Sequence, residues 1–153
     1  MTENEASTGQ KPPRPARTSA IFAGLYRLCA ELGLSPLSEV TFKSGLRADI
    51  VALCPKGMVH IFEVKSSRAD FETDSKWQGY LEWCDHFYFA VDADFPDEVL
   101  PQEHGLVLAD AYGAEIVRDA PQDRVAPARR KALTLLFARK AAERLTAMEN
   151  GMR

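Results

Sequence analysis

Two apolar segments joined by a short turn limit the folds that are open to this chain. Residues 47–54 (RADIVALC) and 58–65 (MVHIFEVK) each have the length of a strand, and Pro55 and Gly57 stand between them, in positions that suit a turn. Apolar residues follow one another in both segments, which is typical of central strands that are covered on both faces. The pattern predicts a hairpin in the middle of a sheet.

The rest of the sequence predicts further helices and strands around this hairpin. Thr18 or Ser19 is the expected N-cap of a first helix that ends at Gly33. The other expected elements are a strand at 39–42, a helix over 66–84 capped by Ser67 or Asp70, a strand at 86–91, a loop with one helical turn, short strands at 106–109 and 115–117, and a helix over 127–148. The order favours an α/β fold with a mixed sheet flanked by helices.

Composition places this fold in one domain. The chain has 153 residues, of which 46% are hydrophobic, so we expect a single domain over residues 18–149 after a polar, proline-rich disordered tail at 1–17. The net charge of −3 excludes nucleic-acid binding through bulk charge alone. The cysteines show no zinc spacing, and neither a secretion signal nor a membrane span is visible, so we expect a cytoplasmic protein that has no contact with a membrane.

Charged residues interrupt the hairpin where it should be most apolar. Side chains alternate along a strand, so Glu63 and Lys65 point to the same face. If the turn is centred on Lys56, Asp49 lies directly opposite Glu63, with the two Cβ atoms roughly 5 Å apart. A slip of one residue would separate the pair onto opposite faces.

Two facing carboxylates require positive charge between them. Oxygen ligands favour a hard cation, so Asp49, Glu63 and the carbonyl of Val64 are candidate ligands of Mg²⁺ or Mn²⁺. Such an ion acidifies water and neutralises charge on a phosphate, and Lys65 is placed to assist. The alternative is a structural network in which Lys65 pairs with Glu63 or Asp49.

This arrangement resembles the PD-(D/E)XK nuclease superfamily, which has a restriction-endonuclease-like αβββαβ core. The match is the pattern D-(x13)-E-x-K, with Ala48 in place of the proline. A closer resemblance is to MmcB-type bacterial DNA-repair proteins. It rests on RADIVAL, FEVKSSRADFETDSKWQGYLEWCDHFYFAV and GLVLADAYGAEIVR, and covers most of residues 20–145. It implies a nuclease-like fold and a role in DNA repair.

The resemblance also implies roles for individual residues. Asp49 and Glu63 correspond to the metal ligands and Lys65 to the catalytic lysine. Glu39 and Glu31 are both candidates for an accessory acid, and Glu39 is favoured because it leads into the Asp49 strand. The Q-x-x-x-Y pattern of RecB-like nucleases is absent from the helix that follows.

Several other residues are candidates for contacts with DNA. A phosphate would suit cations near the site, hydroxyls at a helix start and polar side chains on the following helix. A basic cluster on the last helix is either a DNA-contacting face, a partner surface or a solvated face. The candidates are Lys43, Arg47, Ser66, Ser67, Arg68, Lys76, Gln78, Tyr80, Arg129 and Arg130.

Two functions remain open at this point. The first is a deoxyribonuclease, a hydrolase that cuts DNA phosphodiester bonds with Mg²⁺ or Mn²⁺. The second is a DNA-binding or adaptor module without catalysis on the same fold. DNA is the expected partner in both cases, while a homodimer and other repair proteins remain open.

Overall fold

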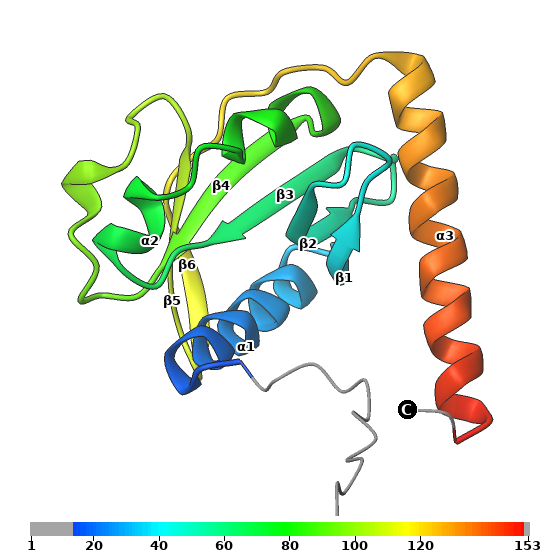
Figure 1. Cartoon of the computed structure of the whole chain (residues 1–153), viewed down its shortest axis with the longest axis horizontal. Helices are drawn as coiled ribbons and strands as arrows, with labels where there is room; N and C mark the ends of the chain where they lie inside the picture. The colour runs from blue at the N-terminus through cyan, green and yellow to red at the C-terminus, as the bar shows by residue number, and fades with distance from the viewer. Residues whose placement is uncertain (1–13, 152–153) are drawn as a thin grey trace, which may run out of the picture.

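The computed structural model describes residues 14–151 and contains one six-stranded sheet (Figure 1). Its strands follow the order of the sequence: β1 (Ser35–Thr41), β2 (Arg47–Leu53), β3 (Val59–Val64), β4 (His86–Val91), β5 (Gly105–Asp110) and β6 (Gly113–Arg118). The first three strands are antiparallel, β3, β4 and β5 are parallel, and β6 is antiparallel to β5. The predicted α/β fold with a mixed sheet and an α-β-β-β-α-β order is confirmed.

The first helix, α1 (Ala16–Glu31), starts earlier than the sequence predicts. Pro15 precedes it, so the expected N-cap at Thr18 or Ser19 was wrong. The helix ends as predicted, because Gly33 adopts a φ of 70°, which suits glycine after a helix. Residues 1–13 of the predicted tail lie outside the part of the chain that the structure describes.

The segment between β3 and β4 differs from the single helix expected over 66–84. Ser67 caps the short helix α2 (Arg68–Glu72), and its hydroxyl accepts a hydrogen bond from the Asp70 N–H at 3.0 Å. A 3₁₀ helix, η1 (Trp77–Trp83), then begins after a break. The carboxylate of Asp74 accepts hydrogen bonds from the N–H groups of Lys76 (2.8 Å) and Trp77 (3.1 Å), which starts the second helix in a new direction.

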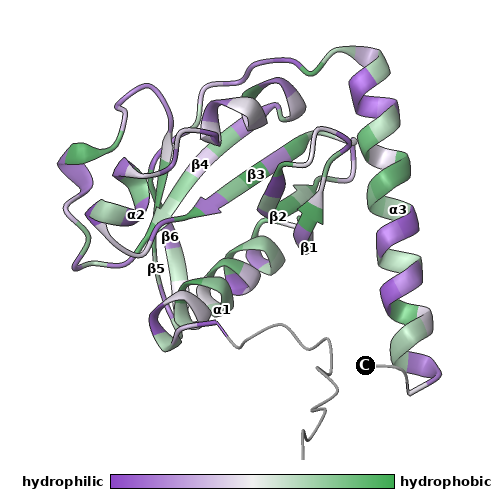
Figure 2. Ribbon diagram, viewed as in Figure 1, coloured by the Kyte–Doolittle hydropathy of each residue, from purple (hydrophilic) through white to green (hydrophobic). Residues whose placement is uncertain are grey.

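The sheet separates two apolar cores. On one face, α1 packs Ile21 and Leu25 against a group that includes Ile50 and Phe62. The opposite face is covered by η1 and by Leu133 of the last helix, α3 (Pro127–Glu149). Figure 2 shows that apolar residues dominate the central strands, whereas α3 carries both colours along its length. The hairpin β2–β3 is thus covered on both faces, as its sequence predicted.

Three further observations bear on the sequence predictions. The 3₁₀ helix η2 (Asp97–Val99) supplies the helical turn expected between β4 and β5. All three cysteines are free thiols. Within residues 14–151, no helix combines the length and the apolar character that crossing a membrane requires.

Candidate active site

The hairpin has the register that the sequence predicts. Its turn is closed by a hydrogen bond of 2.9 Å from the Gly57 N–H to the Cys54 carbonyl, and Ile50 pairs with Phe62. One step further along the same register, Asp49 comes opposite Glu63. The Asp49 carboxylate also accepts a hydrogen bond of 2.8 Å from the Val64 N–H, which fixes it beside the end of β3.

Glu63 is almost completely buried. Only 5% of its surface is exposed, and its Oε2 atom is a buried oxygen that finds no hydrogen-bond partner in the described part of the chain. Burial, followed by the neighbouring Asp49 carboxyl, raises the pKa of Glu63 to about 10. Without a cation, therefore, Glu63 is a neutral acid at physiological pH. A buried polar atom without a partner is costly, so this oxygen is poised to accept a ligand.

Lys65 lies on the same face of the sheet and is paired with an acid that the sequence did not single out. Its Nζ atom lies 2.6 Å from Oδ2 of Asp74, and only 5% of Lys65 is exposed. Burial by itself lowers the pKa of Lys65, but the hydrogen bond to Asp74 and the charge of that carboxylate outweigh it, so the pKa is raised. Lys65 is therefore protonated, and Asp74 holds its ammonium group in place.

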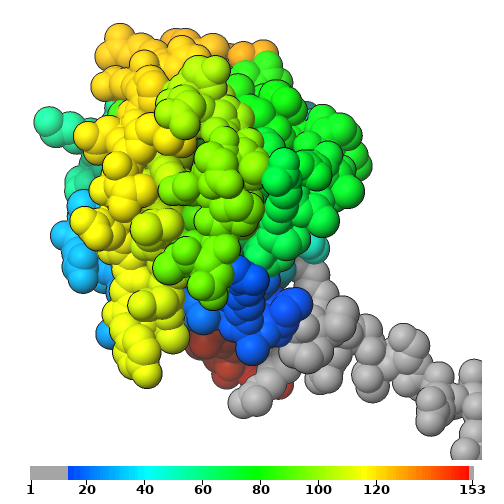
Figure 3. Space-filling model, turned by 90° about the vertical axis from the view of Figure 1, so that its left-hand side faces the viewer, coloured from blue at the N-terminus to red at the C-terminus, as the bar shows by residue number. Residues whose placement is uncertain are grey.

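Asp74 was missed although its sequence context offered a signal. The same carboxylate that holds Lys65 also caps η1, so Asp74 links the candidate site to the following segment. Asp74 lies two residues before Lys76 and three before the apolar Trp77, which is the pattern of an N-cap residue. The expectation of one continuous helix over 66–84 placed Asp74 inside a helix, where a cap is not sought. Figure 3 shows the green residues of this segment beside the chartreuse residues of the loop that leads to β5.

Tyr80 completes the wall of the site. Its hydroxyl donates a hydrogen bond of 2.6 Å to the carbonyl of Arg47, two residues before Asp49. Burial is the main cause that raises the pKa of Tyr80, so the phenol remains protonated. Tyr80 was predicted as a DNA contact; the structure places it, buried, between η1 and the start of β2.

Asp49 and Glu63 could bind a divalent cation, but they supply only part of its ligands. Among the residues that the structure describes, no three His, Cys, Asp or Glu side chains converge as a ready-made metal site. Asp49 and Glu63 nevertheless bring carboxylate oxygens together, and Glu63 has an unpartnered one. A cation held here would take its other ligands from a backbone carbonyl, such as that of Val64, from water and from substrate.

The candidate accessory acid, Glu39, occupies an unusual place in β1. Its φ is 51°, which interrupts the strand opposite Asp49, and its carbonyl accepts a hydrogen bond of 2.9 Å from Arg144. Its carboxylate lies 3.8 Å from Arg14, whose guanidinium stands over the ring of Phe22 in α1. The role of Glu39 as an accessory acid stays a prediction.

The polar residues after β3 lie around the short helix α2. Asp70 accepts hydrogen bonds from the N–H (2.9 Å) and the hydroxyl (3.3 Å) of Ser66, and Ser67 caps the helix. Arg68 is exposed and paired with Glu72, while Lys76 and Gln78 are exposed at the start of η1. The two serines therefore have ordinary local partners, and contacts of this group with DNA stay predictions.

The basic residues that were predicted to contact DNA differ in whether they form ion pairs within the protein. The guanidinium of Arg130 forms two hydrogen bonds with the buried Asp85, at 2.8 and 2.7 Å, and Arg129 lies 3.1 Å from Glu82. Lys43 and Arg47 are exposed near the β1–β2 turn. Arg130 thus anchors the start of α3, whereas Lys43 and Arg47 are exposed on either side of the β1–β2 turn.

These features define a class of protein: an α/β domain with a carboxyl pair and a buried lysine on the central hairpin of a mixed sheet. The chain belongs to the MmcB-like DNA repair protein family, whose model matches residues 4–152. It is similar in structure to SPO1766, a protein of unknown function from Silicibacter pomeroyi, with a TM-score of 0.86 and 48% identity over 91% of this chain and 95% of that one. A search of curated proteins found no match. Membership of this family supports a role in DNA repair.

Proposed function

We propose that the protein is a metal-dependent nuclease of the PD-(D/E)XK type, which hydrolyses DNA phosphodiester bonds during repair. The observation that carries this proposal is the pairing of Asp49 with Glu63, where a buried oxygen of Glu63 has no partner. Protein interiors rarely retain such an atom without a functional reason. A divalent cation would displace the proton from Glu63 and remove this cost.

Each residue of the site has a distinct role in this proposal. Asp49 and Glu63 would hold Mg²⁺ or Mn²⁺, which supplies an acidified water and neutralises charge on the phosphate. Lys65 would contact the phosphate or the attacking water, because its ammonium is the buried cation on the same strand face. Asp74 orients that ammonium, and the Asp49 carboxylate is oriented by the Val64 N–H.

The test is cleavage of labelled DNA with Mg²⁺, Mn²⁺ or EDTA. Branched, nicked, duplex and single-stranded substrates are compared for the wild type, Asp49→Asn, Lys65→Met and the exposed control Asp119→Asn. We expect cleavage that requires the cation, is retained in Asp119→Asn, and falls by at least 100-fold in the other two variants. An Asp49→Asn variant that cleaves DNA at the wild-type rate would refute the assignment.

A second function is favoured by the burial of the site. Glu63 and Lys65 are each only 5% exposed, and Lys65 is already neutralised by Asp74. The same fold would then serve as a DNA-binding module that brings other repair proteins, or a second copy of the chain, to a lesion. It predicts DNA binding that survives both EDTA and Asp49→Asn, with no cleavage under any of the conditions above.

A further inference from the structure

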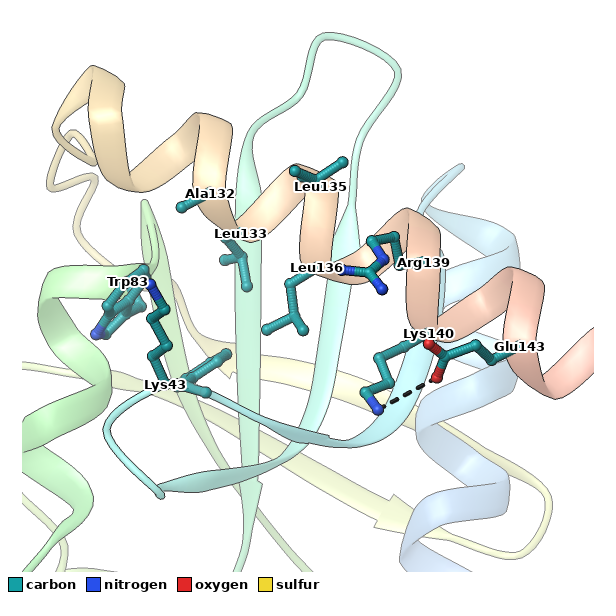
Figure 4. A pocket seen from close by; sticks show the side chains of 10 residues that line it. Lys43, Trp83, Ala132, Leu133, Leu135, Leu136, Arg139, Lys140 and Glu143 are labelled. Carbon is teal, nitrogen blue, oxygen red and sulfur yellow. Dashed lines mark hydrogen bonds and ion pairs between the residues drawn. The ribbon is translucent and has the colours of Figure 1, made fainter.

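A groove of about 500 Å³ lies between α3 and the turn that follows β1 (Figure 4). Its volume is in the range of small-molecule binding sites. The floor is apolar and aromatic, with Phe42, Trp83, Leu133 and Leu136, and basic side chains line the rim, with Lys43, Arg139 and Lys140. Trp83 is half-buried: its ring stacks on Phe42, and the Arg129 guanidinium lies 5.9 Å from the ring centroid.

Two of the three cations around the groove have no partner among residues 14–151. Arg129, Arg130 and Arg144 of α3 are engaged with Glu82, with Asp85 and with backbone carbonyls of β1. Within residues 14–151, the side chains of Lys43 and Arg139 have no hydrogen-bond or ion-pair partner; Lys140 lies 3.3 Å from Glu143. An otherwise acidic chain thus presents uncompensated positive charge at this rim.

Aromatic rings connect the groove to the candidate active site. Tyr80 lies beside Glu63 and meets Phe42 edge-on, with ring centroids 6.1 Å apart. Phe42 in turn stacks on Trp83, with centroids 5.5 Å apart. The groove and the Asp49–Glu63 pair are therefore connected through packed aromatic rings.

We propose that this groove binds unpaired bases of single-stranded DNA, while Lys43 and Arg139 contact the adjacent phosphates. Sequence-tolerant proteins bind single strands through aromatic side chains inside a positively charged groove. Bases in a duplex are stacked within the helix and cannot reach an apolar floor between α3 and the β1–β2 turn. The inference rests on the proposed function, because it names the form of DNA that would reach the site.

The test measures binding in EDTA, where cleavage cannot interfere. Fluorescence anisotropy with a labelled oligothymidine and with the same strand in a duplex is recorded for the wild type and for Lys43→Glu, Arg139→Glu and Trp83→Leu. The matched control is Lys131→Glu, an exposed cation of α3 that lies outside the groove. Thermal melting establishes that each variant is folded, and the exposed Lys43 and Arg139 variants test the groove even if Trp83→Leu is unstable.

We expect the wild type to bind the single strand at least tenfold more tightly than the duplex. Trp83→Leu should lower this affinity about fivefold or more, because the aromatic contact that Trp83 offers to a base is lost. Each charge reversal should lower it about tenfold and should reduce the slope of log affinity against log salt by about 0.7 or more, whereas Lys131→Glu should have a much smaller effect.

Equal affinity for both forms of DNA, or groove variants that match Lys131→Glu, would overturn the inference. A change in self-association without a change in DNA binding would also overturn it, since the groove would then dock protein. Failure of the proposed function is a separate result: the wild type would bind single strands through the groove yet cleave nothing with Mg²⁺ or Mn²⁺. Conversely, metal-dependent cleavage together with unchanged DNA binding in the groove variants would support the nuclease proposal and refute the role of the groove.

Discussion

One carboxylate, that of Asp74, holds the ammonium of Lys65 at 2.6 Å and caps the helix that follows. Its two oxygens divide these tasks: Oδ2 contacts Lys65, and Oδ1 accepts from the N–H groups of Lys76 and Trp77. The position of the lysine is consequently tied to the conformation of the segment between α2 and η1.

The substitution Asp74→Asn separates these tasks. The amide oxygen can still cap η1, but the charge that holds Lys65 is lost, which should cost roughly 1–3 kcal/mol in the free energy of unfolding. If Lys65 is catalytic, we expect cleavage to fall at least tenfold while DNA affinity changes less than twofold. The control is Glu72→Gln, which removes an exposed acid paired with Arg68. Unchanged cleavage in Asp74→Asn would show that Asp74 does not position Lys65 for the reaction.

The pH dependence of stability should report on Glu63. Its pKa in the folded protein is raised to about 10 from an ordinary value of 4.5, so the folded state holds a proton that the unfolded state releases. The stabilisation is fully present below pH 4.5 and is lost as the pH rises toward 10. In EDTA, we therefore expect Glu63→Gln to be more stable than the wild type by a margin that grows from pH 6 to pH 9.

Urea denaturation at these pH values measures this margin, with Glu82→Gln as an exposed control. Mn²⁺ should stabilise the wild type at pH 9 and leave Glu63→Gln much less affected, because only a carboxylate offers the cation its charge. An equal margin at both pH values would mean that Glu63 is ionised in the folded protein without metal.

The start of α3 should depend strongly on Asp85. This buried carboxylate accepts hydrogen bonds from the N–H groups of Val59 and Val125 and from the guanidinium of Arg130. Burial alone would raise the pKa of Asp85, but these donors outweigh it and lower the pKa to about 2. The stabilisation is present above the ordinary pKa of 3.8 and is lost as the pH falls toward 2.

We expect Asp85→Ala to lower the free energy of unfolding by about 3–5 kcal/mol, because it leaves buried donors and the Arg130 guanidinium without their partner. Thermal or urea unfolding at pH 7 measures the loss. Glu82→Ala removes the exposed partner of Arg129 and should change stability by less than about 1 kcal/mol. Equal effects of both substitutions would contradict the structural role of Asp85.

Close packing of α1 makes an unusual prediction for Gly24. Alanine normally stabilises a helix relative to glycine, yet a Cβ atom at this position would lie 2.3 Å from the Asp110 carbonyl and 2.4 Å from that of Gly113. Gly24→Ala should therefore destabilise the protein by roughly 1–3 kcal/mol. Thermal melting provides the measurement. Ala30→Gly, at an exposed position of the same helix, should cost less than about 1 kcal/mol.

The sequence predicted most of the fold because its hairpin was unambiguous. The turn after Cys54 and the apolar runs on either side determined the register, and with it the position of Asp49 opposite Glu63. The break between α2 and η1 was not predicted, because the helical spacing of Trp77, Leu81 and Cys84 is also compatible with one longer helix, and only the cap formed by Asp74 reveals the break. The left-handed backbone at Glu39 was equally hidden, since nothing in its neighbours demands it.

The arginines of α3 illustrate that sequence alone does not distinguish structural cations from cations available to a ligand. Arg129, Arg130, Arg139 and Arg144 look equivalent in the sequence, but each has a different environment. Tertiary contacts assign Arg130 to Asp85 and Arg144 to the carbonyls of Ser38 and Glu39. Only the folded arrangement shows that Arg139 faces the groove and has no hydrogen-bond or ion-pair partner within residues 14–151.

The sequential order of the strands has a consequence for how the chain is made. Every strand after the first pairs with the strand that precedes it in the sequence, so no pairing has to wait for a strand that is made much later. Asp49 and Glu63 lie on one such pair, the hairpin of the second and third strands. We therefore expect the sheet that carries the acidic pair to be able to form before α3 docks on it, because α3 follows all six strands in the sequence.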